Sequence, residues 1–232
     1  MVLRFLAGVQ LTLLFSVGVA ANGTAAGTFS FSSRAQEDQE RAQEEAARQA
    51  ETIKGLVSVP CRDRLKNQRI LVLIGEYSGS QWAASQERYA PLFDIIDARL
   101  RALGLRTYTA QQIKDGVAQA EVNAYFNNDP DAALSASKRL GANYILRSSI
   151  NTRSGTNPVV QVTEVSVDIN LTLSSIDGSI LSNVSTHSDA YSGSDSMSTA
   201  LALIRERADA LVAQLYNDYC RAEFRSPSGA TH

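Results

Sequence analysis

The alternation of apolar and polar positions from Asp129 to Ile150 predicts a complete helix–strand unit. Asp129 can accept hydrogen bonds from free backbone N–H groups at a helix start, and Pro130 suits the first helical position. Gly141 can adopt the left-handed conformation that ends a helix. From Asn143 onward the residues favour β structure, so a strand follows within about two residues. The helix has one narrow apolar stripe, formed by Ala132, Ala133, Ala136 and Leu140.

The stretch before this unit predicts strands alternating with helices. Arg69–Ile74 is almost continuously apolar, as expected of a central strand covered on both faces. One-sided apolar spacing predicts helices over residues 89–103 and 111–127. Between them, Leu105–Tyr108 reads as a short strand that pairs parallel to the first.

The stretch after it predicts a hairpin and a long helix. Residues 151–158 are read as a polar turn, and residues 160–173 as a strand whose change of parity at 163–164 predicts a β-bulge. After a turn at Asp177–Gly178, Ile180–Tyr191 forms a more polar edge strand that is capable of β-augmentation. The last helix starts near Ser194–Ser196 and carries the cleanest apolar stripe, and we expect a disordered tail over residues 221–232.

These elements predict one α/β domain over residues 61–220, in which helices cover a mixed sheet. A polar helix is expected over residues 34–57, after a flexible linker over residues 22–33. Its apolar seam is mostly alanine, so it is either a spacer or docking helix, or a solvated helix. The second interpretation is favoured because alanines bury little area.

Residues 1–21 have the layout of a secretory signal peptide, with cleavage before Asn22. Arg4 precedes a mostly apolar run that ends in small residues. The alternative is a membrane anchor, but polar residues interrupt the run and it is short for a bilayer span. We therefore expect an exported, periplasmic protein without an integral membrane segment after cleavage, and association with the outer membrane through partners is left open.

The two cysteines, Cys61 and Cys220, bracket the predicted domain. In an oxidising compartment this placement indicates a disulfide. Two unpaired thiols are the alternative, because sequence does not give the distance between the two Cα atoms.

Charge and histidine content exclude several function classes. The chain has 22 basic and 24 acidic residues and a formal net charge of −2, which gives no electrostatic attraction to nucleic acid. The histidines, His187 and His232, form no motif typical of a catalytic triad or a metal site. We expect no enzyme, no catalytic residue, no cofactor and no metal.

Residues 75–88 follow the first strand, where α/β proteins often bind ligands. The glycines match neither a phosphate-binding loop nor a dinucleotide fingerprint. We interpret the segment as a long polar loop, either a contact surface or a simple connector. Its candidate interaction residues are Glu76, Tyr77, Ser78 and Trp82.

The run Leu140-Gly-Ala, followed by Asn143-Tyr-Ile-Leu-Arg147, resembles the middle of small α/β domains of bacterial envelope proteins. These are the curli secretion channel component, the N-terminal domain of the Tol translocation protein, the Pel polysaccharide lipoprotein and the lipoprotein activator of penicillin-binding proteins. The resemblance covers roughly residues 69–220. The lipid-acceptor cysteine of the lipoproteins is absent near Asn22, which favours a soluble exported protein.

The resemblance implies a non-enzymatic accessory protein that contributes an interaction surface to an envelope assembly. Secretion, polysaccharide export and control of peptidoglycan synthases are the processes it suggests, with an envelope protein complex or copies of the same chain as partners. The alternative function is a periplasmic small-ligand binding module that uses the 75–88 loop.

Overall fold

The computed structural model describes residues 31–78, 81–85, 87–127, 129–156, 159, 161–191 and 195–225. The signal peptide expected at residues 1–21, most of the linker and the end of the tail lie outside these residues. The chain divides into two units, residues 1–43 and 44–232. Helix α1 (Phe31–Val57) has residues in both units; it contains the segment expected to form a polar helix and starts within the expected linker.

Within the described residues, the second unit holds a six-stranded sheet. Its strands are β1 (Arg69–Ser78), β2 (Gln81–Ala83), β3 (Arg106–Thr107), β4 (Tyr144–Thr156), β5 (Thr163–Ser175) and β6 (Ile180–Tyr191). Its further helices are α2 (Arg62–Leu65), α3 (Ala90–Ala102), α4 (Ala110–Gly116), α5 (Gln119–Phe126), α6 (Pro130–Leu140) and α7 (Ser196–Arg225).

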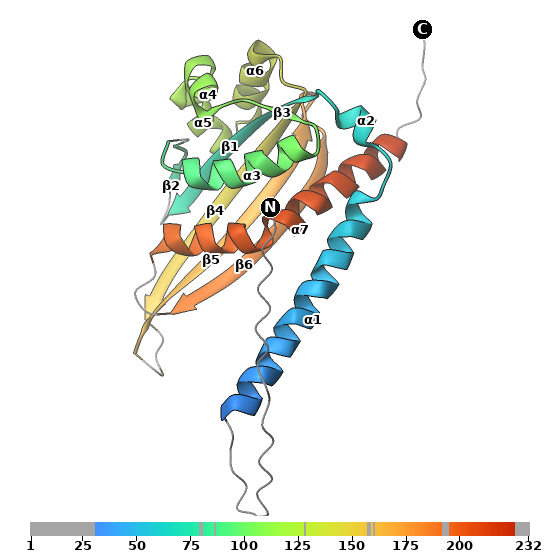
Figure 1. The fold of residues 1–232 in the computed structure, drawn as a ribbon. Coiled ribbons are helices and arrows are strands. Elements are labelled where there is room, and N and C mark those ends of the chain that lie inside the picture. Colours follow the sequence, from blue (N-terminus) through green and yellow to red (C-terminus); the bar gives the residue numbers. More distant parts are fainter. Residues whose placement is uncertain are drawn as a thin grey trace, which may run out of the picture. The chain divides into compact units, whose positions relative to one another are not determined.

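The sheet is mixed, which confirms the predicted α/β class. Its strand order is β2-β1-β4-β5-β6, and β3 pairs with the first residues of β1 (Figure 1). Strand β1 runs parallel to β3 and β4, whereas the pairs β1–β2, β4–β5 and β5–β6 are antiparallel. Strand β1 is central and apolar on both faces, and Leu71–Ile74 are fully buried.

Helices cover one face of the sheet and part of the other (Figure 1). Helices α3 and α7 pack against each other over the face that carries Ile70, Leu146 and Leu173. On the opposite face, Phe126 of α5 lies over Gly75 of β1. That face is polar along β4, β5 and β6, because strand residues alternate between the two faces. We call the residues that share it the polar face: Ser149, Asn151, Arg153, Ser166, Asp168, Asn170, Thr172, Asn183, Ser185, His187 and Asp189.

The helix–strand unit around α6 forms as predicted. The carboxylate of Asp129 accepts a hydrogen bond from the backbone N–H of Ala132 at 3.3 Å. Gly141 has a φ of 69° and ends the helix, and β4 begins at Tyr144. Local capping chemistry therefore determines both ends of this helix.

The single helix predicted over residues 111–127 is wrong, because two helices occupy this segment. Helix α4 ends before Val117, which is extended, with a φ of −129° and a ψ of 119°. Helix α5 starts after Ala118, whose backbone N–H donates to the Glu121 carboxylate at 3.0 Å. The apolar residues of the two short helices follow one another at helical spacing, so in the sequence they resemble the apolar stripe of a single long helix.

Three boundaries in the sheet also differ from the predictions. Much of the expected 75–88 loop is a hairpin, in which β1 continues to Ser78 and pairs with β2. The expected turn at residues 151–158 is wrong as well, since β4 continues to Thr156 opposite β5. The register is regular at the predicted bulge, and the irregularity lies at Leu173/Ser174, opposite β6.

The C-terminal helix is longer than predicted and is tied to the start of the domain. Helix α7 continues to Arg225, so the first residues of the expected disordered tail are helical. Cys61 and Cys220 form a disulfide, with their Cα atoms 5.7 Å apart. Among the described helices, none is both long enough and apolar enough to cross a membrane.

Candidate functional site

The predicted interaction residues do not gather at one place. Glu76 and Tyr77 are neighbours in β1, so their side chains point to opposite faces of the sheet. Trp82 lies on the same face of the sheet as Tyr77, because the two residues pair across the β1–β2 hairpin. Ser78 pairs with Gln81 through the backbone, and its side chain lies outside the described part of the structure.

Tyr77 and Trp82 belong to a group that we call the aromatic–arginine cluster: Tyr77, Trp82, Tyr125, Phe126 and Arg147. The Arg147 guanidinium carbon lies 5.4 Å from the Trp82 ring centroid, 5.3 Å from that of Tyr125 and 5.0 Å from that of Phe126. These distances are in the range of cation–π attraction. The Trp82 ring also lies 5.2 Å from Tyr77 and 5.3 Å from Phe126.

The base of the cluster is fixed by packing. Phe126 is fully buried, and its backbone carbonyl accepts a hydrogen bond from Arg147 at 3.2 Å. Arg147 Nε is buried and has no hydrogen-bond partner among the described residues. Contact with the aromatic faces is therefore the main compensation for burying this part of the guanidinium. Burial raises the pKa of Tyr125, against the opposing effect of Arg147. Tyr77, Trp82 and Arg147 are half-buried above this base.

Glu76 is on the other face and has a structural role. It is 4% exposed, and its carboxylate accepts hydrogen bonds from Tyr89 at 2.7 Å and from Thr152 at 3.0 Å. Arg88 forms an ion pair with it at 3.1 Å. Burial, followed by the hydrogen bond to Glu76, raises the pKa of Tyr89. Both carboxylate oxygens are engaged, so Glu76 joins β1 and β4 to the start of α3.

His187 is the histidine within the described residues, and it lies on the polar face. Its Nδ1 is 2.8 Å from an Asp168 oxygen and its Nε2 is 3.1 Å from an Asp189 oxygen. Arg153 also pairs with Asp168, at 2.7 Å. Both ring nitrogens therefore have carboxylate partners and neither activates a nucleophile. Among the described residues, no group of His, Cys, Asp or Glu side chains is arranged to hold a metal ion.

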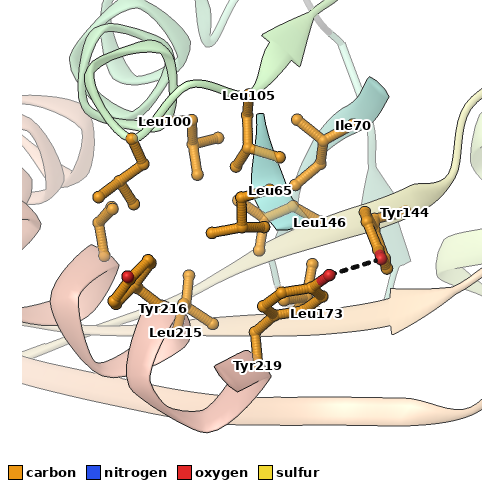
Figure 2. Close-up of a pocket in the computed structure, with 12 residues that line it drawn as sticks. Leu65, Ile70, Leu100, Leu105, Tyr144, Leu146, Leu173, Leu215, Tyr216 and Tyr219 are labelled. Carbon is orange, nitrogen blue, oxygen red and sulfur yellow. Dashed lines mark hydrogen bonds between the residues drawn. The ribbon is translucent and has the colours of Figure 1, made fainter. Parts of the chain in front are cut away.

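The cavity between the sheet and helices α3 and α7 is too small for a ligand (Figure 2). Its volume is about 20 Å³, its lining is apolar apart from tyrosine hydroxyls, and the Tyr144 and Tyr219 hydroxyls at its side are hydrogen-bonded at 3.0 Å. It is a packing void, of a size for about one water.

A larger cleft, of about 360 Å³, lies between the start of α3 and helices α4 and α5. Ile113, Val117 and Val122 form its apolar floor. Lys114 and Glu87 lie at its rim, 4.0 Å apart. Its volume is in the range of small-molecule sites. Part of its lining comes from the predicted 75–88 segment.

Sequence reasoning missed Arg147, Tyr125 and Phe126 as site residues. The available signal was Arg147 itself, a charged residue in a strand between apolar Leu146 and Ile145 on one side and Ile150 on the other. A charge in a covered strand needs a partner. The pattern gives its face but not the rings that surround it.

A scan against protein-family models and a search of curated proteins find no match for this chain. Among solved structures, the chain is similar to the PelC dodecamer from Paraburkholderia phytofirmans, at 16% identity and a TM-score of 0.38, over 68% of this chain and 91% of that one. It is also similar to lipoprotein GNA1162 from Neisseria meningitidis, at 18% identity and a TM-score of 0.41, over 63% and 98% of the two chains. The LpoB C-terminal domain from Salmonella enterica gives 14% identity and a TM-score of 0.36, over 59% and 91%.

PelC and LpoB correspond to the Pel lipoprotein and the penicillin-binding-protein activator of the resemblance drawn from the sequence. The curli and Tol members of that resemblance stay predictions. Likenesses this distant assign neither an activity nor a partner to the chain.

Proposed function

We propose that this protein is a non-enzymatic, exported accessory protein of a bacterial envelope assembly, which binds a partner protein through the aromatic–arginine cluster. The observation that carries the proposal is the half-buried group of Tyr77, Trp82 and Arg147 over a buried base. Tyrosine, tryptophan and arginine are the residue types that dominate binding energy at protein interfaces. The rigid base holds them in place before binding, which lowers the entropy cost of association.

The cellular setting of the proposal rests on two further observations. Residues 1–21 have the layout of a signal peptide, and the Cys61–Cys220 disulfide suits an oxidising compartment. Secretion, polysaccharide export and peptidoglycan-synthase control are the candidate processes, and they follow from the sequence resemblance alone.

The test is crosslinked affinity capture of the mature protein from intact bacterial envelopes, with the captured proteins identified by mass spectrometry. Arg147→Lys is the test variant, because the lysine ammonium lacks the planar guanidinium that can stack on the rings. Arg153→Lys is the matched control, since it lies on the same strand and the same face but outside the cluster. We expect a defined envelope complex with the wild type and the control, and its loss with Arg147→Lys and with Tyr77→Ala.

Equal thermal stabilities of the variants are needed for this comparison. Recovery of no protein other than the bait from the wild type would sink the proposal. So would full recovery of the complex with both cluster variants.

A second candidate function, the binding of a small ligand, is favoured by the cleft at Glu87 and Lys114. The apolar floor with a few charged rim groups is typical of small-molecule sites. A thermal-shift screen of periplasmic metabolites would test it, with Lys114→Ala as the variant that removes the rim cation. A ligand that stabilises the wild type but not this variant would support the function, and no stabilising ligand would count against it.

A further inference from the structure

Strand β6 is an edge strand of the sheet, and its register irregularity lies near its start, between Ile180 and Ser182. Among the described residues it pairs only with β5, and it lies at the margin of the sheet (Figure 1). Natural sheets protect such edges with proline, lysine, bulges or short strands. Strand β6 is 12 residues long and contains no proline, lysine or arginine. Ile180 at its start is 68% exposed.

A groove runs beside this edge, between β6 and α7. Val184 and Thr186 of β6 and Ala210 and Leu211 of α7 line it, and Ser185 lies between the two strand residues. Arg207 and Gln214 of α7 complete the lining, so the groove combines apolar and polar groups. A strand added to β6 would place alternate side chains into it.

We propose that two copies of this protein associate through β6, in an antiparallel pair centred on Ser185. The proposal does not depend on the proposed function. In this register Val184 of each copy lies opposite Thr186 of the other, so each copy fills the groove of its neighbour. Because the pair is centred on a residue, both α7 helices stay on the same face of the joined sheet.

The charges of β6 favour this register. The side chains of β6 that can carry a charge near neutral pH are His187 and Asp189, both on the polar face. Centring on Ser185 places each His187 opposite Asn183 of the other copy, and Asp189 diagonal to the same amide, which can donate to its carboxylate. Centring on His187 or on Asp189 would instead oppose two like groups.

The test introduces like charges at the centre of the pair. Ser185 is exposed, so Ser185→Lys and Ser185→Asp leave the monomer's packing unchanged. In the dimer each variant opposes its own charge across the two-fold axis, and we expect dimerisation roughly fivefold weaker by analytical ultracentrifugation. An equal mixture of the two variants opposes lysine to aspartate and restores the dimer. The same changes at Ser154, an exposed serine of β4, serve as the control and leave dimerisation unchanged.

A wild type that stays monomeric at every concentration overturns the proposal. Dimers that are insensitive to both Ser185 variants, or that the mixture fails to restore, place the contact on another surface and also overturn it. Equal thermal unfolding curves for all variants show that the charges act on association and not on folding.

Discussion

At Gly75 the lack of a side chain lets the Phe126 ring lie directly on β1. A Cβ atom there would be 2.7 Å from Phe126 Cε1, and Phe126 is fully buried. Overpacking of this kind typically costs about 1–3 kcal/mol. We therefore expect Gly75→Ala to lower the free energy of unfolding by this amount, measured by urea denaturation. Gly155→Ala is the control, because a Cβ at that position meets nothing within 4 Å.

His187 makes the polar face sensitive to pH. Hydrogen bonds to Asp168, and then to Asp189, raise the pKa of His187 above its ordinary value. Arg153 of β4 pairs with Asp168 of β5 and is the other cation of this group. A histidine whose pKa is raised on folding contributes stability below the unfolded pKa of about 6.5 and loses it as pH rises through the folded value.

His187→Gln should therefore destabilise the protein more at about pH 5 than at about pH 8. The measurement is urea denaturation of the wild type and the variant at both pH values, with the two free energies of unfolding subtracted. An equal difference at the two pH values would show that the imidazole charge makes no net contribution. The His187 titration by NMR gives an independent check of the pKa direction.

At the scale of single elements, helix α6 shows how much a cap determines. Asp129→Ala removes the acceptor of the Ala132 N–H, so we expect a loss of about 0.5–2 kcal/mol in the free energy of unfolding. Asp129→Asn keeps an acceptor and should restore most of the loss. If alanine and asparagine have equal effects in thermal denaturation, the cap bond contributes nothing.

Element starts and ends with local chemistry were predictable from the sequence. Asp129 and Gly141 gave both ends of α6, and Asp177–Gly178 gave the turn before β6. The second half of β4 was not predictable in this way. Its polar residues are held by cross-strand partners, as in the Arg153–Asp168 pair, and those partners come from another part of the sequence.

The candidate site was partly predictable for the same reason. Tyr77 and Trp82 were recognisable as aromatic residues in a polar segment after a buried strand. Their companions Tyr125 and Phe126 come from a helix about 50 residues further along the chain, and Arg147 comes from the adjacent strand. For Glu76, reading the segment as a loop hid the alternation that turns its side chain toward α3, and its role in an interaction stays a prediction.

At the scale of the whole domain, the two proposed contacts lie at opposite margins of one sheet. The aromatic–arginine cluster is built on the hairpin side, where β2 ends the strand order, and β6 ends it on the other side. Arg147 of the cluster lies on β4, so β5 is the strand that separates the cluster from β6. The two proposals together predict that a partner protein and a second copy bind the same domain at the same time.

The disulfide connects the two ends of this domain. Cys61 precedes α2 and Cys220 lies in α7, and the two are 159 residues apart in sequence. Both are almost fully buried, at 3% and 0% exposed. Next to them, the Tyr216 hydroxyl donates a hydrogen bond to the Val59 carbonyl at 2.6 Å. This bond also holds the segment just before α2, the domain entry, against α7. The crosslink therefore restricts the unfolded chain while the folded contacts stay in place.

Reduction should lower the free energy of unfolding by about 2–5 kcal/mol, because a loop of this length loses much of its entropy when closed. Guanidinium unfolding with and without a thiol reductant measures the change. A Cys61→Ser/Cys220→Ser double variant should unfold at the midpoint of the reduced wild type and should not respond to the reductant. If alkylation shows both thiols free and the wild-type midpoint is nevertheless unchanged, the folded contacts between α7 and the domain entry hold the two ends without help from the bond.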